Sequence, residues 1–231
     1  MNYILEGFEE AIFLIISGDP EIYRIIGFSL MISLASTLFS LLIGVPLGLM
    51  TGIRNFKSKK LFARIIHTLM GLPPVVVGLL VALFLSRQGP LGQFQLMYTA
   101  TAMIIAQTIL VTPIIVGNVF DNCREYGKVA YEVCDTLGGN RSQKLYFLVR
   151  EMRIGILTGM TAGFGRAISE VGAIMIVGGN IAGHTRVMTT FIAMNTSMGN
   201  YGASIAMGLV LFLFAFLLNG CFLYFIEGRE S

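Results

Sequence analysis

AYEVCDTLGGNRSQKLYFLVREMR, residues 130–153, is a polar, charge-rich stretch in a chain that is otherwise mostly apolar. Gly138 divides it, and the pattern predicts a helix, a glycine break and a second helix. Either Asn140 or Ser142 is placed to cap the second helix, because a short side-chain oxygen satisfies an unpaired backbone N–H there.

Within that second helix, four apolar residues recur at helical spacing: Leu145, Leu148, Val149 and Met152. The basic residues of the same segment are placed elsewhere. A helix of this kind lies on a membrane surface or binds a groove of a partner protein. By pattern alone it is also an ordinary amphipathic loop.

The composition around this stretch requires a membrane. The chain has 231 residues, of which 55% are hydrophobic and 13% charged, and its mean hydropathy is +0.77. Soluble domains carry about 25% charged residues. Such a chain cannot cover a globule with polar surface, so we expect one polytopic membrane domain over residues 1–231 with the lipid bilayer as its solvent. A net charge of +3 gives no reason to expect a nucleic-acid partner.

The apolar runs predict an all-α fold with five transmembrane helices, since a spanning helix needs about 20 residues. The expected spans are 25–52, 61–85, 97–119, 154–177 and 203–226. Residues 1–20 are too short to span and are expected to form an interfacial helix. Residues 178–200 form a polar loop with room to re-enter the membrane. Residues 130–153 are expected in the cytoplasm.

The basic residues set the orientation, because Lys and Arg are retained in the cytoplasm. The loops after the first and third spans hold Arg54, Lys57, Lys59, Lys60 and Arg64, and Arg124, Lys128, Arg141, Lys144, Arg150 and Arg153. The loops after the second and fourth spans hold Arg87 and Arg186 alone. The bias predicts an external N-terminus, with residues 130–153 and the C-terminus inside the cell.

Small residues mark one face of the fourth span, where Gly155, Gly159 and Gly163 recur every four residues. Membrane helices approach closely along such stripes. The stripe is either a simple helix-packing seam or the border of a translocation path or twofold interface.

Two charges lie on the same span. Arg166 and Glu170 are four residues apart and so share one side of a helix. A charge in the hydrocarbon costs at least about 2.5 kcal/mol. The pair is either a structural ion pair at a kink, or an arginine lining an anion route with a glutamate holding it.

Proline and glycine mark two further places. Pro73 and Pro74 remove helix donors from the second span and are either plain kinks or the bends of a gate. In the loop after the fourth span, glycines and Asn180, His184, Thr185 and Arg186 offer backbone donors and a cation. That loop is either a tight external turn or an anion-facing surface.

The chain contains no Gly-x-x-x-x-Gly-Lys-Ser/Thr motif with which to bind ATP. No Ser/His, His/Glu or paired-carboxylate arrangement indicates a catalytic site, and the cysteines have no metal-ligand spacing. We therefore expect no enzyme, no metal and no cofactor in this chain. Five spans make a thin bundle, for which a homodimer with the path on its twofold axis is the economical arrangement.

The polar stretch also resembles the coupling loop of importer-type ABC permeases. That pattern opens Glu-Ala-Ala with Gly six residues after the Glu, and here Glu132-Val133-Cys134 and Gly138 hold those positions. The family's later Ile-x-Leu-Pro falls on Leu148-Val149-Arg150-Glu151, so its Leu-Pro half is missing. The resemblance implies that residues here contact an ATPase: Glu132, Asp135, Gly138, Arg141 and Lys144.

Further motifs resemble the molybdate and tungstate permeases within that family. They are Gly71-Leu72-Pro73-Pro74-Val75-Val76-Val77-Gly78, Gly165-Arg166-Ala167-Ile168-Ser169-Glu170-Val171-Gly172-Ala173, Val177-Gly178-Gly179-Asn180-Ile181 and Gly183-His184-Thr185-Arg186. Ile168-Ser169-Glu170-Val171, Ala182-Gly183-His184 and Gly18-Asp19-Pro20-Glu21 are most similar to tungstate-uptake permeases.

This resemblance implies a type I ABC importer permease fold. It also implies an ATP-driven tungstate importer with two permeases, two cytoplasmic ATPase subunits that bind ATP and Mg²⁺, and an external oxyanion-binding protein facing the loop of Asn180 and Arg186. Molybdate is the alternative substrate. The rival class is an ATP-independent channel or secondary carrier that uses Arg166 and Glu170 as a relay.

Overall fold

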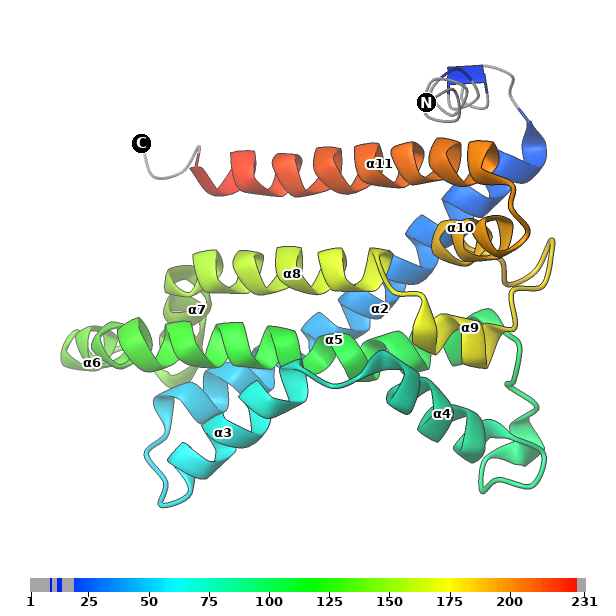
Figure 1. Ribbon diagram of the computed structural model, residues 1–231. Helices are drawn as coiled ribbons and strands as arrows, with labels where there is room; N and C mark the ends of the chain where they lie inside the picture. Colours follow the sequence, from blue (N-terminus) through cyan, green and yellow to red (C-terminus); the bar gives the residue numbers. More distant parts are fainter. Residues whose placement is uncertain (1–8, 10–11, 14–18, 228–231) are drawn as a thin grey trace.

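The structure is a computed structural model that describes residue 9, residues 12–13 and residues 19–227, and it is all-helical over these residues (Figure 1). Its helices are α2 (Pro20–Ile53), α3 (Lys59–Met70), α4 (Pro74–Leu85), α5 (Ala100–Asn122), α6 (Lys128–Thr136), α7 (Arg141–Glu151), α8 (Arg153–Ile168), α9 (Gly172–Gly178), α10 (Met188–Ser197) and α11 (Tyr201–Glu227). A 3-10 turn (Gly92–Phe94) and a π-helical turn (Cys123–Gly127) complete it. The interfacial helix expected over residues 1–20 lies largely outside the described residues.

Helix α5 is the centre of the fold, and it is the most buried of the three long apolar helices. Two glycine stripes let other helices approach it. Gly155, Gly159 and Gly163 place α8 against Asn122, Asn118 and Val111 of α5. A second stripe places α2 against α5 from another side, formed by Gly44, Gly48 and Gly52. Without a hydrophobic drive between helices in lipid, this close packing supplies much of the attraction.

The described residues hold three apolar clusters, two of which include residues of α5. One joins α4, α5 and α9 through residues such as Val81, Met103 and Val177. Another joins the start of α2 with α8, α10 and α11 around Phe164 and Met207. The third joins the far end of α2 with α5, α7 and α8.

Two of the expected spans are bent. Helices α3 and α4 meet at 93°, and α8 and α9 meet at 58°. By length and composition the described residues hold three helices able to cross a membrane, or up to five if each bent pair counts as one. The span expected over 154–177 is interrupted within this range, because α8 stops at Ile168 and α9 starts at Gly172.

Other boundaries also differ from the expectation. Helix α2 begins at Pro20 because the Asp19 side chain accepts a hydrogen bond from the Glu21 N–H and caps it. Helix α5 begins at Ala100, capped by Thr99, and runs through the π-helical turn into α6. The polar loop over 178–200 contains α10, which begins where Ser29 of α2 accepts a hydrogen bond from the Met188 N–H.

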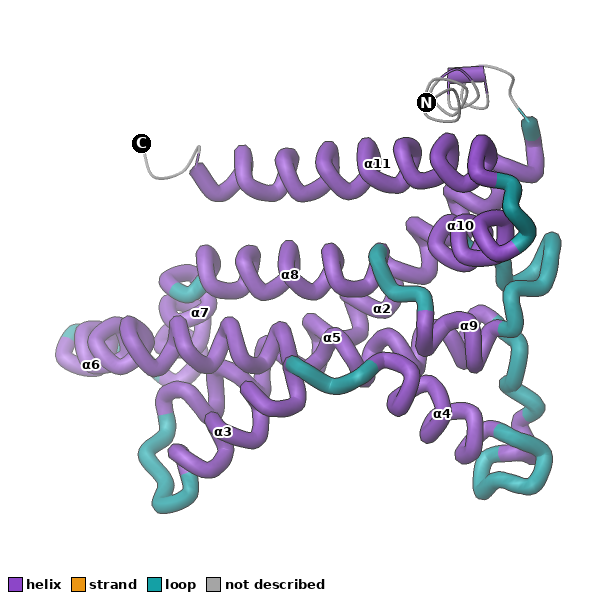
Figure 2. The backbone as a smooth tube through the Cα atoms, viewed as in Figure 1, coloured by secondary structure: helices purple, strands orange, loops and turns teal. Residues whose placement is uncertain are grey.

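The loops and short helices gather at two opposite ends of the helix bundle (Figure 2). Helices α6 and α7, the loop between α2 and α3, and the last turns of α11 lie at one end. The start of α2, the loop before α5, and α9 and α10 lie at the other. The chain therefore places its richest basic segments together at one end of the bundle.

Candidate functional site

The helix pair α6–α7 is built by local sequence signals. Helix α6 ends in a Schellman motif: the Gly138 N–H donates to the Asp135 carbonyl and the Gly139 N–H donates to the Cys134 carbonyl. Gly138 has φ +73°, a backbone region that favours glycine. The glycine break expected at this position is confirmed, and it reverses the chain between the two helices.

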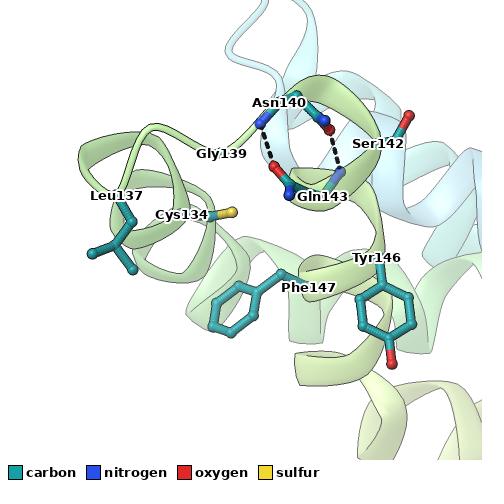
Figure 3. Close-up of a pocket in the computed structure, with 8 residues that line it drawn as sticks. All are labelled: Cys134, Leu137, Gly139, Asn140, Ser142, Gln143, Tyr146 and Phe147. Atoms are coloured by element: carbon teal, nitrogen blue, oxygen red, sulfur yellow. Dashed lines mark hydrogen bonds between the residues drawn. The ribbon is translucent and has the colours of Figure 1, made fainter.

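Helix α7 begins with a capping box, drawn in Figure 3. The Asn140 side chain accepts from the Gln143 N–H at 2.9 Å, and the Gln143 side chain accepts from the Asn140 N–H at 2.8 Å. Of the two expected caps, Asn140 is the one used, whereas Ser142 lies inside the helix. The two bonds fix the start of α7 relative to the turn.

A charged contact also connects α6 to α7. The Lys144 ammonium on α7 donates to the Asp135 carboxylate on α6, and it lies 5.3 Å from the centre of the Tyr131 ring. The hydrogen bond to Asp135 raises the pKa of Lys144, so the ammonium stays charged. Glu132 lies exposed on α6 beside them. The structure thus brings together four of the five expected coupling residues, and the backbone of Arg141 forms the first turn of α7.

A pocket of about 570 Å³ opens between α6 and α7. Figure 3 shows its lining, with Cys134 and Leu137 from α6 and its end, and Tyr146 and Phe147 from α7. Leu137 is 81% exposed and Tyr146 is 71% exposed. Apolar and aromatic side chains this open, held on a rigid helix pair, are suited to docking into a partner protein.

A second candidate region is the break between α8 and α9. The Arg166 Nε lies 3.8 Å from Glu170 Oε2, so the two predicted charges face each other. Glu170 is 5% exposed and its Oε1 accepts from the Ala173 N–H at 3.1 Å. Arg166 is 36% exposed. The carboxylate therefore holds the arginine and the first turn of α9 together at the bend.

Two residues that the sequence analysis did not single out complete this region. Gln107 of α5 is buried, donates to the Ala167 carbonyl at 2.8 Å and accepts from Ser36 of α2 at 2.8 Å. Thr189 of α10 donates to the Glu170 carbonyl at 2.8 Å. Backbone groups freed by a broken helix need such partners in a membrane. A glutamine inside an apolar span was the available signal.

Pro73 and Pro74 lie at the other bend. Pro73 precedes α4 and Pro74 is its first residue, where a missing N–H removes no hydrogen bond. The second helices of the two bent pairs, α4 and α9, pack together, because Gly78 of α4 lies against Ala173 and Gly172 lies against Val75. The prolines and the Arg166–Glu170 pair therefore act on adjoining elements.

The residues of the loop after α9 form a separate cluster. Thr185 is buried, donates to the Gly178 carbonyl and accepts from the Ile181 N–H. Arg186 donates to the Asn180 side chain at 3.3 Å and lies 3.8 Å from the Glu21 carboxylate. His184 is exposed. Thr185 thus shapes the turn, His184 lies on its surface, and the Arg186 side chain, which is 16% exposed, connects Asn180 to Glu21.

Comparison with known proteins supports one family. Residues 44–228 match the model of the binding-protein-dependent transport system inner membrane component. The chain is 47% identical over 219 residues to the tungstate uptake system permease protein TupB of Peptoclostridium acidaminophilum, covering 95% of this chain and 96% of that one. It is 42% identical over 188 residues to a probable anion ABC transporter permease protein of Haloferax volcanii, covering 79% and 81%.

A solved structure shares the fold. The inward-facing MetNI methionine ABC transporter contains a chain that superposes with a TM-score of 0.72 at 16% identity, over 90% of this chain and 95% of that chain. The chain therefore belongs to the inner-membrane permease family of binding-protein-dependent ABC transport systems.

Proposed function

We propose that the chain is the membrane-spanning permease subunit of an ATP-driven importer that takes up tungstate. The observation that carries this proposal is the 47% identity, over nearly the whole of both chains, to a tungstate uptake permease. The alternative substrate is molybdate, because the two oxyanions are nearly isosteric and a separate binding protein makes the choice.

We propose that α6–α7 couples this chain to a separate ATPase subunit, which binds ATP and Mg²⁺. The exposed Leu137 and Tyr146 and the pocket between the two helices support this assignment. Docking there places the helix pair in the cytoplasm, in agreement with the positive-inside bias. The N-terminus is then outside, and the surface of Asn180 and Arg186 faces the external binding protein.

The translocation path is proposed to lie on the twofold axis of a homodimer. In the described residues of one chain, α11 has only 28% of its apolar window buried, which leaves a large face for lipid or a second copy. Arg166 is the part of the bend that reaches an open surface, whereas Glu170 is enclosed. We assign Arg166 to the path and Glu170 to holding it, with rigid-body switching about the interfaces as the mode of transport.

Co-purification with the ATPase tests the coupling assignment. Glu132→Lys reverses a charge on the exposed face of α6, and Gly138→Asp strains the turn between the helices. Both changes are expected to release the ATPase. The matched controls are Glu132→Gln and Gly138→Asn, since asparagine and aspartate tolerate the left-handed backbone alike and the second pair therefore isolates the added charge. Retention of the ATPase by both test variants would refute the assignment.

Uptake into proteoliposomes tests the substrate and the energy source. The complete complex with binding protein and ATP is expected to accumulate tungstate, with unlabelled molybdate as the competitor. Accumulation against a gradient by this chain alone would favour a secondary carrier instead, and passive equilibration of tungstate by this chain alone would favour a channel. A higher uptake of molybdate than of tungstate would reassign the substrate within the family.

A further inference from the structure

A second cavity, the groove, lies beside α7 and is separate from the pocket between α6 and α7. It has a volume of about 520 Å³ and runs between the last turns of α2 and the coupling helices. Leu49, Met50 and Arg54 line it from α2, and Lys144, Leu145 and Val149 line it from α7. Its two walls therefore come from a membrane-spanning helix and from a helix outside the spans.

The two cavities use opposite faces of α7. Leu145 and Val149 are one turn apart and line the groove, whereas Gln143 and Phe147 are one turn apart and line the pocket. If the pocket face receives the ATPase, the groove face points away from it. The groove is then open to a different occupant.

The groove has an apolar interior that is open at its rim. Leu49 and Leu148 are almost completely buried and form its floor. Leu145 is 58% exposed and Val149 is 40% exposed, although they lie beside the end of an apolar spanning helix. Apolar side chains exposed beside the end of a spanning helix are stabilised by contact with an apolar occupant rather than with water.

Positive charge lies at one end of the same groove. Arg54 directly follows the last residue of α2 and is exposed. Lys144 adds a second cation, an ammonium that is paired with the Asp135 carboxylate, so the Arg54 guanidinium is the principal cation. A cation at the end of an apolar channel, where a spanning helix leaves the bilayer, matches an amphiphile with a negative head group.

We propose that this groove binds an anionic phospholipid, with an acyl chain along Met50, Leu145 and Val149 and its phosphate at Arg54 and Lys144. A free oxyanion would leave the apolar interior uncovered, and a purely apolar helix would leave Arg54 without a counter-ion. The lipid would hold α7 at the membrane surface while its other face engages the ATPase. The proposal does not depend on which ion is transported.

Tryptophan fluorescence in lipid vesicles tests the proposal on the full-length chain. The sequence has no tryptophan, so a single introduced one is the sole reporter. Leu145→Trp places it in the groove and Tyr146→Trp places it on the pocket face, as the matched control. Each variant is reconstituted with brominated phosphatidylglycerol among phosphatidylcholine, or with brominated phosphatidylcholine among phosphatidylglycerol, at equal quencher content.

The expected result is strong quenching of Leu145→Trp, greater by brominated phosphatidylglycerol, and weak quenching of Tyr146→Trp by either lipid. Adding Arg54→Gln should lower the preference for phosphatidylglycerol about fivefold, as expected for one basic contact at a membrane surface. Lys144→Gln is the second variant, with a smaller loss. Thermal denaturation of each variant checks that the fold is retained.

Three results would overturn the proposal. Equal quenching of the two tryptophans would mean that the groove is not a lipid site. Equal quenching of Leu145→Trp by the two lipids, or a preference that survives Arg54→Gln, would mean that it does not select negative head groups. Loss of the preference on adding excess glycerol phosphate would assign the cations to a soluble phosphate instead.

Discussion

The stripe of glycines on α2 predicts a large contrast between two identical substitutions in one helix. At Gly48 an added Cβ would lie 2.8 Å from Val119 Cβ and 3.1 Å from the Val116 carbonyl oxygen. At Gly27 in the same helix nothing lies within 4 Å. Gly48→Ala therefore crowds the α2–α5 contact, whereas Gly27→Ala adds a methyl group in open space.

The magnitude follows from two terms. Replacing glycine by alanine within a helix stabilises it by about 1 kcal/mol. Overpacking a close contact costs about 1–3 kcal/mol, and the buried, β-branched Val119 has little freedom to rotate away. The helix term is common to both variants and cancels in the comparison. Gly48→Ala should therefore be less stable than Gly27→Ala by about 1–3 kcal/mol.

Thermal unfolding of the detergent-solubilised chain, followed by the fraction that stays monodisperse, measures this difference. Each kcal/mol shifts Tm by about 2–4 °C in a chain of this size. Gly27→Ala should raise Tm or leave it unchanged, and Gly48→Ala should lower it. If Gly48→Ala proves as stable as Gly27→Ala, α2 does not approach α5 as closely as the structure places it.

Three other measurements follow from the site. Gln107→Leu should lower stability by about 1–2 kcal/mol, because only the two hydrogen bonds made by Gln107 are lost, while the Ala167 carbonyl and the Ser36 hydroxyl each keep a second one. Urea–SDS titration against Gln107→Glu measures this loss of stability, and an unchanged unfolding midpoint would refute the prediction. Asn140→Ala should weaken the start of α7 by about 1 kcal/mol and speed exchange of the Gln143 amide, with Ser142→Ala as the control; equal exchange in both would contradict the capping role. The raised pKa of Lys144 means that its pairing with Asp135 stabilises α6–α7 fully below the ordinary value of 10.5 and is lost only as pH rises through the higher folded value. The protection of the α7 amides from hydrogen exchange should therefore stay unchanged between about pH 7 and 9, and a loss of protection there that Lys144→Gln does not show would contradict the raised pKa of Lys144.

Local signals in the sequence were sufficient to predict the helix pair α6–α7. Gly138 and Asn140 act within a few residues of themselves, through a left-handed turn and a capping box. Their consequences can be read without knowing what packs nearby. The same holds for the all-helical membrane class, because an apolar backbone segment in lipid must satisfy its own hydrogen bonds.

The break in the fourth span could not be derived in this way. Residues 154–177 read as one apolar run around Arg166 and Glu170, and the break in it is held by the Glu170 side chain together with contacts from distant helices. Gln107 takes the Ala167 carbonyl and Thr189 takes the Glu170 carbonyl, 60 and 19 residues away along the chain. The glutamine inside an apolar span was a signal that Gln107 has a role, but what Gln107 and Thr189 bind depends on where α5 and α10 pack.

The sequence by itself determined the membrane class, the family motifs and the local geometry of the turn at Gly138, since each depends on composition or on neighbours along the chain. The tertiary structure alone decided that α5 is the centre and which of its sides receives each glycine stripe. It also divided α7 into a pocket face with Tyr146 and a groove face with Leu145. The physical reason is that a helical period tells which residues share a face, but only packing between distant segments decides what that face meets.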